Sequence, residues 1–340
     1  MSSKRLVEKT LSFDSPDRIP RQTWILPWAE ANYPDEVETL RSAYPDDIIF
    51  APALYKTSPK TIGDKYAVGE YVDEWGCRFS NVHGGVIGVV RQPLLDDWDD
   101  LDRLQPPAET LSVDSDAVNA FCRSRDAFVL SAFPGQRPFE RFQFIRTMER
   151  ALIDLVTEPP GLPELLNLIH AHYCKEVEAW ARTEVDGIML MDDWGTQQGL
   201  IVSPDIFRRF FKPMYRDYAD IAKRFGKSLF MHSDGNIAEI LPDLIEVGVD
   251  ALNSQLFCMD IESLGERFRG KITFWGEIDR QTILPRGSRQ DIARAVHKVH
   301  DNLYCDGGVI AQCEFGLGAR PENVLAVFET WDSIKVSEDS

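Results

Sequence analysis

Three short apolar runs in the last third of the chain are each followed by a residue that can bind a metal or transfer a proton. His232 follows the run 228–231, Glu277 follows 272–276, and Cys313 follows 308–312. In a barrel of parallel strands, the carboxyl ends of the strands carry the chemistry. An imidazole, a carboxylate and a thiolate with one open position form the donor set of a catalytic zinc. Asp234 is the alternative ligand to Glu277, or it orients His232.

A second group of candidates could bind substrate. Asp192 and Asp193 close the run 187–191, and such a pair could hold a polar substrate or raise one pKa; capping of the following loop is the alternative. The aromatic residues Trp24, Trp28, Phe133 and Trp194 could line a pocket, although core packing explains such residues equally well. His232 and Cys313 also have plain structural interpretations, a hydrogen-bonded histidine and a buried thiol.

The elements that must position these residues alternate between strand and helix from about residue 126 onward. Helical histidines, His172 among them, are interpreted as surface or packing residues. A β-hairpin excursion is expected over 70–93, with strands at 71–79 and 86–92 around a turn at 83–85. The alternation predicts one α/β domain over residues 1–340, a single (β/α)8 barrel with this N-terminal excursion. Its strands are expected at 18–26, 47–52, 127–133, 187–194, 227–231, 249–254, 271–276 and 308–312, and its main helices at 35–43, 138–157, 162–183, 204–225, 236–247, 259–268, 288–303 and 321–335.

Composition excludes several classes of function. The chain has 37 basic and 55 acidic residues and a net charge of −18, so it repels phosphate backbones and nucleic acid is not an expected partner. No apolar run approaches the roughly 18 residues of a membrane span, and the first residues lack the core of a signal peptide, which predicts a cytoplasmic protein. Six cysteines without a Cys-x-x-Cys pair are expected to be free thiols. A homodimer is compatible with the sequence.

Taken together, the motifs resemble the uroporphyrinogen decarboxylase superfamily, and within it the corrinoid-linked methyltransferase branch. The resemblance extends over most of the chain and implies a single (β/α)8 barrel. Its markers are Asp-Arg-Ile-Pro (17–20), Val-Asp-Glu-Trp-Gly-Cys (72–77), Met-Asp-Asp-Trp-Gly (191–195), Leu-Ile-Val-Ser-Pro (200–204), Phe-Lys-Pro (211–213), His-Ser-Asp-Gly (232–235), Gly-Glu-Ile-Asp (276–279) and Pro-Glu-Asn-Val (321–324).

Departures from the pattern of the true decarboxylases favour the methyltransferase branch. The segment 22–28 has no arginine to clamp a polycarboxylate, and Ala51-Pro52 stands where those enzymes have a catalytic aspartate. Cys313 stands in place of their histidine. In the methyltransferases, the residues that match His232 and Cys313 bind zinc, and many members have a cysteine where this chain has Asp234. The resemblance therefore implies zinc on His232 and Cys313, with Glu277 or Asp234 completing the set.

The expected function is a zinc-dependent methyltransferase that transfers a methyl group between a small molecule and the cobalt of a corrinoid bound to a partner protein. The aromatic residues after the first strand favour an aryl methyl ether as donor to Co(I), and transfer to a zinc-bound thiol is the reverse variant. One alternative is a metal-free decarboxylase-like lyase that uses Asp192 or Asp193. Another is a non-catalytic module that binds a tetrapyrrole or corrinoid.

Overall fold

The computed structural model describes residues 1–335, and eight of its strands form one parallel sheet. The strand order is β1-β11-β10-β9-β8-β7-β6-β2. The two outermost strands approach each other, because the Asp47 amide donates to the Arg21 carbonyl at 2.9 Å and the Gln22 side chain donates to the Ile48 carbonyl at 3.0 Å. The sheet is thus a nearly closed barrel, as predicted. The barrel strands are β1 (Arg21–Ile25), β2 (Ile48–Phe50), β6 (Phe128–Leu130), β7 (Gly187–Met191), β8 (Ser228–Ser233), β9 (Ala251–Ser254), β10 (Thr273–Trp275) and β11 (Val309–Phe315).

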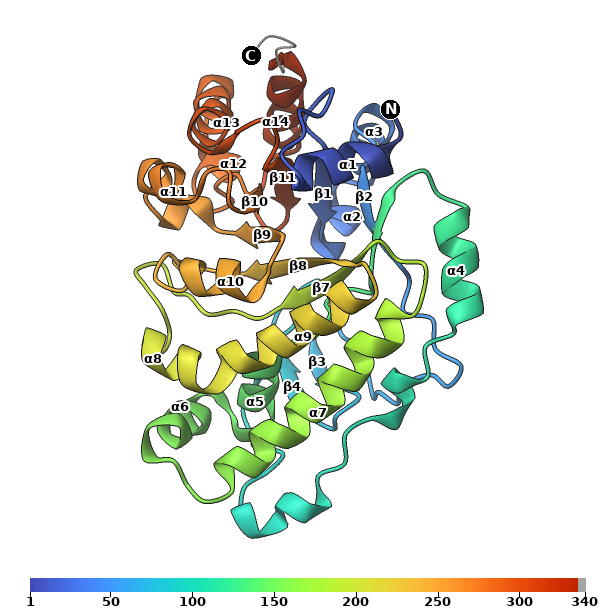
Figure 1. The fold of residues 1–340 in the computed structure, drawn as a ribbon, viewed down its shortest axis with the longest axis vertical. Helices are drawn as coiled ribbons and strands as arrows, with labels where there is room; N and C mark the ends of the chain where they lie inside the picture. Colours follow the sequence, from blue (N-terminus) through green and yellow to red (C-terminus); the bar gives the residue numbers. More distant parts are fainter. Residues whose placement is uncertain (336–340) are drawn as a thin grey trace.

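Alternate residues of each barrel strand point into the barrel. The strand register places Met189 beside Phe230 and Phe230 beside Ala251, and these side chains share one interior cluster. Helix α1 (Ser3–Leu11) contributes Val7 to the same cluster and closes the amino-terminal end of the barrel. The other face of each strand packs against the surrounding helices in a larger apolar cluster. Figure 1 shows the helices around the sheet, with α1 and α14 at the same end of the molecule.

Most predicted helices are present, but two are interrupted. The predicted helix 138–157 is divided at Thr147, whose φ of 67° is incompatible with helical backbone. The predicted helix 204–225 contains a π-helical turn at Phe207–Phe211. Helices α2 (Pro27–Asn32), α4 (Ser115–Arg123) and α12 (Ile283–Arg286) were not predicted.

The remaining helices are α3 (Pro34–Ala43), α5 (Pro138–Arg146), α6 (Met148–Thr157), α7 (Leu162–Ala181), α8 (Pro204–Ile206), α9 (Lys212–Arg224), α10 (Leu241–Val247), α11 (Ile261–Phe268), α13 (Arg289–Leu303) and α14 (Pro321–Ser333), with 3-10 turns at Trp98–Arg103, Ala108–Leu111 and Leu256–Cys258.

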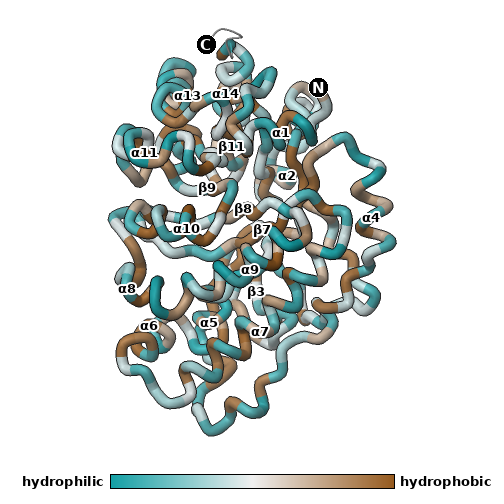
Figure 2. Tube along the Cα trace, viewed as in Figure 1, coloured by the Kyte–Doolittle hydropathy of each residue, from teal (hydrophilic) through white to brown (hydrophobic). Residues whose placement is uncertain are grey.

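Local sequence explains where these helices begin and which face they bury. Ser288 and Asp291 form a capping box at the start of α13, and Asp114 accepts a hydrogen bond from the Ala117 amide at the start of α4. Hydrophilic and hydrophobic residues alternate along the outer helices in Figure 2, as expected for helices with one face against a barrel. No helix within residues 1–335 is long and apolar enough to cross a membrane.

The excursion between β2 and β6 is a three-stranded antiparallel sheet rather than a hairpin. Its strands are β3 (Gly69–Val72), β4 (Arg78–Asn81) and β5 (Val89–Val90). The predicted first strand 71–79 contains a tight turn, because Asp73 Oδ1 accepts hydrogen bonds from the amides of Trp75 at 3.0 Å and Cys77 at 2.8 Å. The predicted turn at 83–85 does separate β4 from β5, and there a Cβ on Gly85 would lie 3.1 Å from the Trp28 amide nitrogen. The excursion therefore reaches the helix that follows β1.

Candidate active site

The carboxyl end of the barrel brings together polar side chains from neighbouring strands. Met191 at the end of β7 lies beside His232 of β8, and His232 lies beside Asn253 of β9. Because these positions follow the inward-pointing Met189, Phe230 and Ala251 by two residues, they face the barrel interior as well. The loops after β7 and β8 add Asp193 and Asp234 to this cluster.

His232 is buried, with only 3% of its surface exposed, and its ring is held by a hydrogen bond. Its Nδ1 lies 2.6 Å from Asn253 Oδ1, while Asn253 Nδ2 donates to the carbonyl of Trp275. Since the Asn253 amide nitrogen is committed to that carbonyl, its oxygen must accept from His232 Nδ1–H. Nε2 is thereby directed toward the two carboxylates, at 3.6 Å from Asp193 Oδ1 and 3.4 Å from Asp234 Oδ1. A histidine fixed through one nitrogen and open at the other has the geometry of a metal ligand.

Two glycines allow the loops that carry Asp193 and Asp234 to approach each other. A Cβ on Gly195 would lie 2.7 Å from the Asp234 carbonyl oxygen, and a Cβ on Gly235 would lie 2.3 Å from the Gly195 carbonyl carbon. The Gly195 amide donates to the Asp234 carbonyl at 3.0 Å, and the Asp234 amide donates to Asp193 Oδ1 at 3.0 Å. The Asp-Trp-Gly and Asp-Gly motifs thus bring the two carboxylates to one side of His232.

Arg280 lies among three carboxylates on the other side of Asp234. Its guanidinium contacts Asp234 Oδ2 at 2.5 Å, Glu314 Oε2 at 2.9 Å and Glu277 Oε1 at 3.6 Å. Asp234 is therefore held by Arg280 through one oxygen, while its other oxygen, Oδ1, is buried, makes no hydrogen bond among residues 1–335 and lies 3.4 Å from His232 Nε2. A buried carboxylate oxygen without a partner is costly unless a ligand completes it.

The charges of this cluster shift its pKa values in opposite directions. Burial alone lowers the pKa of His232, but contact with Asp234 and the charge of Asp193 outweigh burial and raise that pKa to about 9. Burial opposes ionisation of Asp234, yet His232 and Arg280 hold the pKa of Asp234 well below its usual range. Burial raises the pKa of Glu277 to about 8 despite the opposing effect of Arg280. Such a set of shifted values is typical of functional sites.

The structure does not bring Cys313 to this cluster. In β11, Ile310 belongs to the barrel interior, whereas Ala311, Cys313 and Phe315 belong to the outer apolar cluster that packs on the helices. Cys313 lies beside Thr23 of β1 in the strand register and is fully buried. The residue of β11 that faces the barrel mouth is its neighbour Glu314. Glu277 does lie near the cluster, but its contact there is with Arg280.

The pair Asp192 and Asp193 divides into two different environments. Asp192 is fully buried, and its two carboxylate oxygens accept hydrogen bonds from the amides of Phe139 and Glu140 and from the Tyr215 hydroxyl, at 2.8, 2.7 and 2.5 Å. It therefore anchors the start of α5 to the end of β7. Asp193 is one-third exposed and faces His232. Of the two, only Asp193 is accessible at the barrel mouth.

Of the four aromatic residues predicted to line a pocket, two lie at the barrel mouth and two lie elsewhere. Trp24 lies with its ring centroid 5.0 Å from that of His232, and the centroid of the partly exposed Phe133 is 5.6 Å from that of Trp24. Together with Phe50, 5.2 Å from Phe133, they form an aromatic wall at the mouth. Trp28 instead packs against Tyr33 beside the excursion. Trp194 is fully buried and stacked on Phe139 at 4.1 Å, so it is part of the core.

The donors at the mouth fit a divalent cation. Single donor atoms of Asp193, His232 and Asp234 all lie within 4.8 Å of one another. One imidazole nitrogen and two carboxylate oxygens suit zinc as well as harder divalent metals. The unpartnered Asp234 Oδ1 and the fixed tautomer of His232 are both consistent with a bound metal. The predicted set was His232, Cys313 and Glu277, with Asp234 as the alternative to Glu277; the cluster in the structure keeps His232 and Asp234, adds Asp193 and leaves out Cys313 and Glu277.

Comparison with known proteins agrees with the fold and the motifs. A family model described as uroporphyrinogen decarboxylase (URO-D) matches residues 72–334. The chain belongs to the uroporphyrinogen decarboxylase family. This is an enzyme family, and the resemblance inferred from the motifs is confirmed.

One solved structure supports the same fold for this uroporphyrinogen decarboxylase family member. A methyltransferase from Methanosarcina mazei aligns with a TM-score of 0.69 at 16% identity, over 98% of this chain and 99% of that one. A glycosylated endo-beta-1,4-xylanase of glycoside hydrolase family 10 from Gloeophyllum trabeum aligns more loosely, with a TM-score of 0.39 at 12% identity, over 64% and 79% of the two chains. No curated protein matches the sequence.

Two residues of this uroporphyrinogen decarboxylase family site escaped the sequence analysis. Asn253, which fixes the ring of His232, follows the strand residues Ala251 and Leu252 just as His232 follows its own apolar run. The same strand-end rule that selected His232 would have selected it. Arg280 directly follows the Gly-Glu-Ile-Asp motif, but nothing in its local sequence distinguishes a cation among three carboxylates from an exposed arginine.

Proposed function

We propose that this chain is a metal-dependent methyltransferase that transfers a methyl group from a small donor to the Co(I) of a corrinoid carried by a partner protein. The observation that carries the proposal is the convergence of His232 Nε2, Asp193 Oδ1 and Asp234 Oδ1, with the two carboxylate oxygens 3.6 and 3.4 Å from the histidine nitrogen. The motif resemblance favours this branch of the family, and the fold match to a methyltransferase is consistent with it.

His232, Asp234 and Asp193 would hold the metal, which we propose to be zinc. A zinc ion there supplies Lewis acidity toward the heteroatom that loses the methyl group. The protein positions its own groups around that point. Asn253 keeps the proton of His232 on Nδ1, and Arg280 binds Asp234 through Oδ2 so that Oδ1 stays directed at His232. These two are positioning residues.

The aromatic wall supports an aryl methyl ether as donor. Trp24, Phe50 and Phe133 present ring surfaces beside His232, where an aromatic donor can stack and displace water. Phe133 keeps 39% of its surface exposed, so the wall is accessible from the mouth. Exposed apolar residues of the excursion, among them Val86 and Val89, offer a surface on which the corrinoid protein can dock beside the mouth.

Metal analysis together with a transfer assay tests this proposal. We expect about one zinc per chain in the wild type and methyl transfer from an aryl methyl ether to free cob(I)alamin, followed by absorbance under anaerobic conditions. The Asp234→Asn and Asp193→Asn variants should lose zinc and activity together, whereas the matched Cys313→Ala variant should keep both. A wild type without divalent metal, or metal that survives both aspartate substitutions, would contradict the proposal.

Family membership keeps a metal-free lyase as the second candidate. In that case Asp193 would take the catalytic role, since Asp192 is committed to α5 and Tyr215. Release of carbon dioxide from a carboxylated substrate by chelator-treated protein, abolished in Asp193→Asn, would favour the lyase over the methyltransferase.

A further inference from the structure

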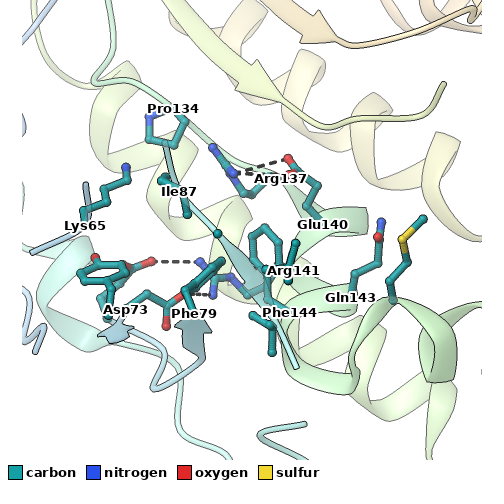
Figure 3. Close-up of a pocket in the computed structure, with 16 residues that line it drawn as sticks. Lys65, Asp73, Phe79, Ile87, Pro134, Arg137, Glu140, Arg141, Gln143 and Phe144 are labelled. Carbon is teal, nitrogen blue, oxygen red and sulfur yellow. Dashed lines mark hydrogen bonds and ion pairs between the residues drawn. The ribbon is translucent and has the colours of Figure 1, made fainter. Parts of the chain in front are cut away.

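A cavity of about 380 Å³ lies between the excursion sheet and helix α5. Figure 3 shows the side chains that line it. Most of its wall is apolar, with Tyr71 and Phe79 from the excursion strands, Ile87 from the β4–β5 loop and Phe144 from α5. Its polar side includes Lys65 and Arg137. The metal-binding cluster is not part of its lining.

Three carboxylates line the cavity, and Arg141 engages two of them. The third, Glu140, lies 3.4 Å from Arg137, and burial raises the pKa of Glu140 to about 7. Asp73 and Glu74 both bind Arg141, and Asp73 also accepts hydrogen bonds from the amides of Trp75 and Cys77. Arg141 is buried and binds these two carboxylates together with the Tyr173 hydroxyl, so it is a structural cation. Asp73, Glu74 and Arg141 therefore need no further partner.

The two remaining cations have unused donors. Lys65 is half-buried, and within residues 1–335 its ammonium group makes no ion pair or hydrogen bond; it lies 5.5 Å from the centroid of the Tyr66 ring. Arg137 is 14% exposed and makes only a loose pair with Glu140, at 3.4 Å, while its other terminal nitrogen lies against Met191 Sδ. A half-buried lysine and an arginine with open donors are what an anion site provides.

These two cations also act on each other unfavourably. Burial lowers the pKa of Lys65, and the charge of Arg137 lowers it further. Two positive charges at one cavity repel each other, and an anion placed between them removes the repulsion and gains charge-assisted hydrogen bonds.

We propose that this cavity is a binding site for a small organic anion with an apolar body, held at its carboxylate by Lys65 and Arg137. The apolar part of the ligand lies against Phe79, Ile87 and Phe144. Arg137 also contacts Met191, which lies beside His232 in the barrel register, so the site adjoins the active site without sharing its metal ligands. The site does not depend on which reaction the barrel catalyses.

Calorimetric titration with sodium benzoate, beside its neutral counterpart benzamide, tests the charge requirement. The full-length, zinc-loaded protein should bind one benzoate per chain and bind benzamide at least about tenfold more weakly, because only the carboxylate accepts charge-assisted hydrogen bonds. Inorganic sulfate should also bind more weakly than benzoate, since it leaves the apolar wall unfilled. Equal affinity for benzoate and benzamide would overturn the proposal.

Variants locate the site. Lys65→Gln and Arg137→Gln should each weaken benzoate about tenfold to a hundredfold, and Lys65→Arg should retain most of the affinity. Arg78→Gln is the matched control, because Arg78 lies on β4 but is exposed and paired with Glu70; its affinity should stay within about twofold of wild type, since exposed ion pairs contribute little. Thermal melts check that each variant folds. Wild-type affinity in both glutamine variants would overturn the assignment.

A metal-site variant separates this proposal from the proposed function. Asp234→Asn should lose zinc and yet bind benzoate as the wild type does. Benzoate binding that disappears together with zinc would place the anion at the barrel mouth and contradict a separate site. Absence of zinc and transfer activity in the wild type, with benzoate binding intact, would reject the methyltransferase but leave this site standing.

Discussion

Two buried histidines of this protein have similar exposure and opposite chemistry. His232 at the barrel mouth is 3% exposed and His172 in α7 is 5% exposed. Carboxylates surround the first, and its pKa rises to about 9. The second contacts Thr110 Oγ1 at 3.0 Å and the edge of Trp75, and burial followed by the charges of Arg141 and Lys175 lowers its pKa to about 4.

The difference teaches that burial alone does not identify a functional histidine. Both rings lose water, which disfavours the charged imidazolium in each case. The two rings differ in the surroundings of Nε2. In His232 this nitrogen faces two carboxylates. In His172 it is hydrogen-bonded to the Thr110 hydroxyl, and the Glu176 carboxylate lies 3.8 Å away. His172 was predicted to be a surface or a packing residue, and its burial in the core shows that it is a packing residue.

Exchanging each histidine for asparagine gives the largest expected contrast. His232→Asn should lower zinc affinity and methyl transfer by more than about a hundredfold, since even the loss of a supporting residue costs up to that much. His172→Asn should leave both within about threefold of wild type. Metal analysis and the cob(I)alamin assay measure the effects. Equal losses in the two variants would remove the distinction between the two sites.

Asn253 tests whether the fixed tautomer is what distinguishes His232. Asn253→Leu removes the acceptor of the Nδ1 proton, and zinc affinity should fall by about tenfold to a hundredfold. Asn253→Asp keeps an acceptor at the same place and should keep most of the affinity. Competition with a chromophoric chelator gives the dissociation constants. Unchanged affinity in the leucine variant would show that the ring is held by packing alone.

The low pKa of His172 predicts a specific loss of stability in acid. Because the pKa falls from 6.5 to about 4 on folding, the unfolded chain binds the proton more readily, and stability is lost as pH decreases through this window. Between pH 7 and pH 5 the free energy of unfolding should fall by about 2 kcal/mol more in the wild type than in His172→Gln. Urea denaturation at the two pH values measures this. Parallel pH dependence in the two proteins would contradict the comparison.

The smallest effect is expected at Cys313, which faces away from the mouth. Cys313→Ala leaves a small cavity between β11 and the helices and should cost about 1 kcal/mol of stability. Zinc content should be unchanged. Loss of zinc in this folded variant would show that β11 presents its other face to the site.

The sequence was sufficient for the barrel and for His232, Asp193 and Asp234, because each stands directly at or after the end of a strand. It was not sufficient to predict where β11 ends or which of its side chains face the barrel interior. The run 308–312 was taken as the whole strand, but the strand continues to Phe315, and a run buried on both faces carries no alternation that tells inward from outward residues. Cys313 and Glu314 were therefore indistinguishable in orientation until the register with β1 was known.

Other differences between prediction and structure came from contacts and backbone conformations that the hydrophobic pattern does not reveal. The Asp192 carboxylate accepts hydrogen bonds from two backbone amides at the start of α5, which lie 53 and 52 residues earlier in the sequence. The break at Thr147 divides a segment whose apolar spacing reads as one continuous helix. Asp73 turns the chain by accepting two amides within an otherwise strand-like segment. At Asp192 and Asp73 a polar contact, and at Thr147 a backbone with positive φ, overrides the hydrophobic period on which the prediction depended.

The pairing of β1 with β11 has a consequence for biosynthesis. Arg21 lies opposite Ala311, so the neighbour of the first barrel strand is synthesised 290 residues after it. Trp24 and Glu314 are opposed at this seam and reach the mouth only when it closes. A chain that ends before β11 leaves one edge of β1 unpaired, and exposed strand edges are prone to pairing with other chains. The mouth is complete only when β11 has paired with β1.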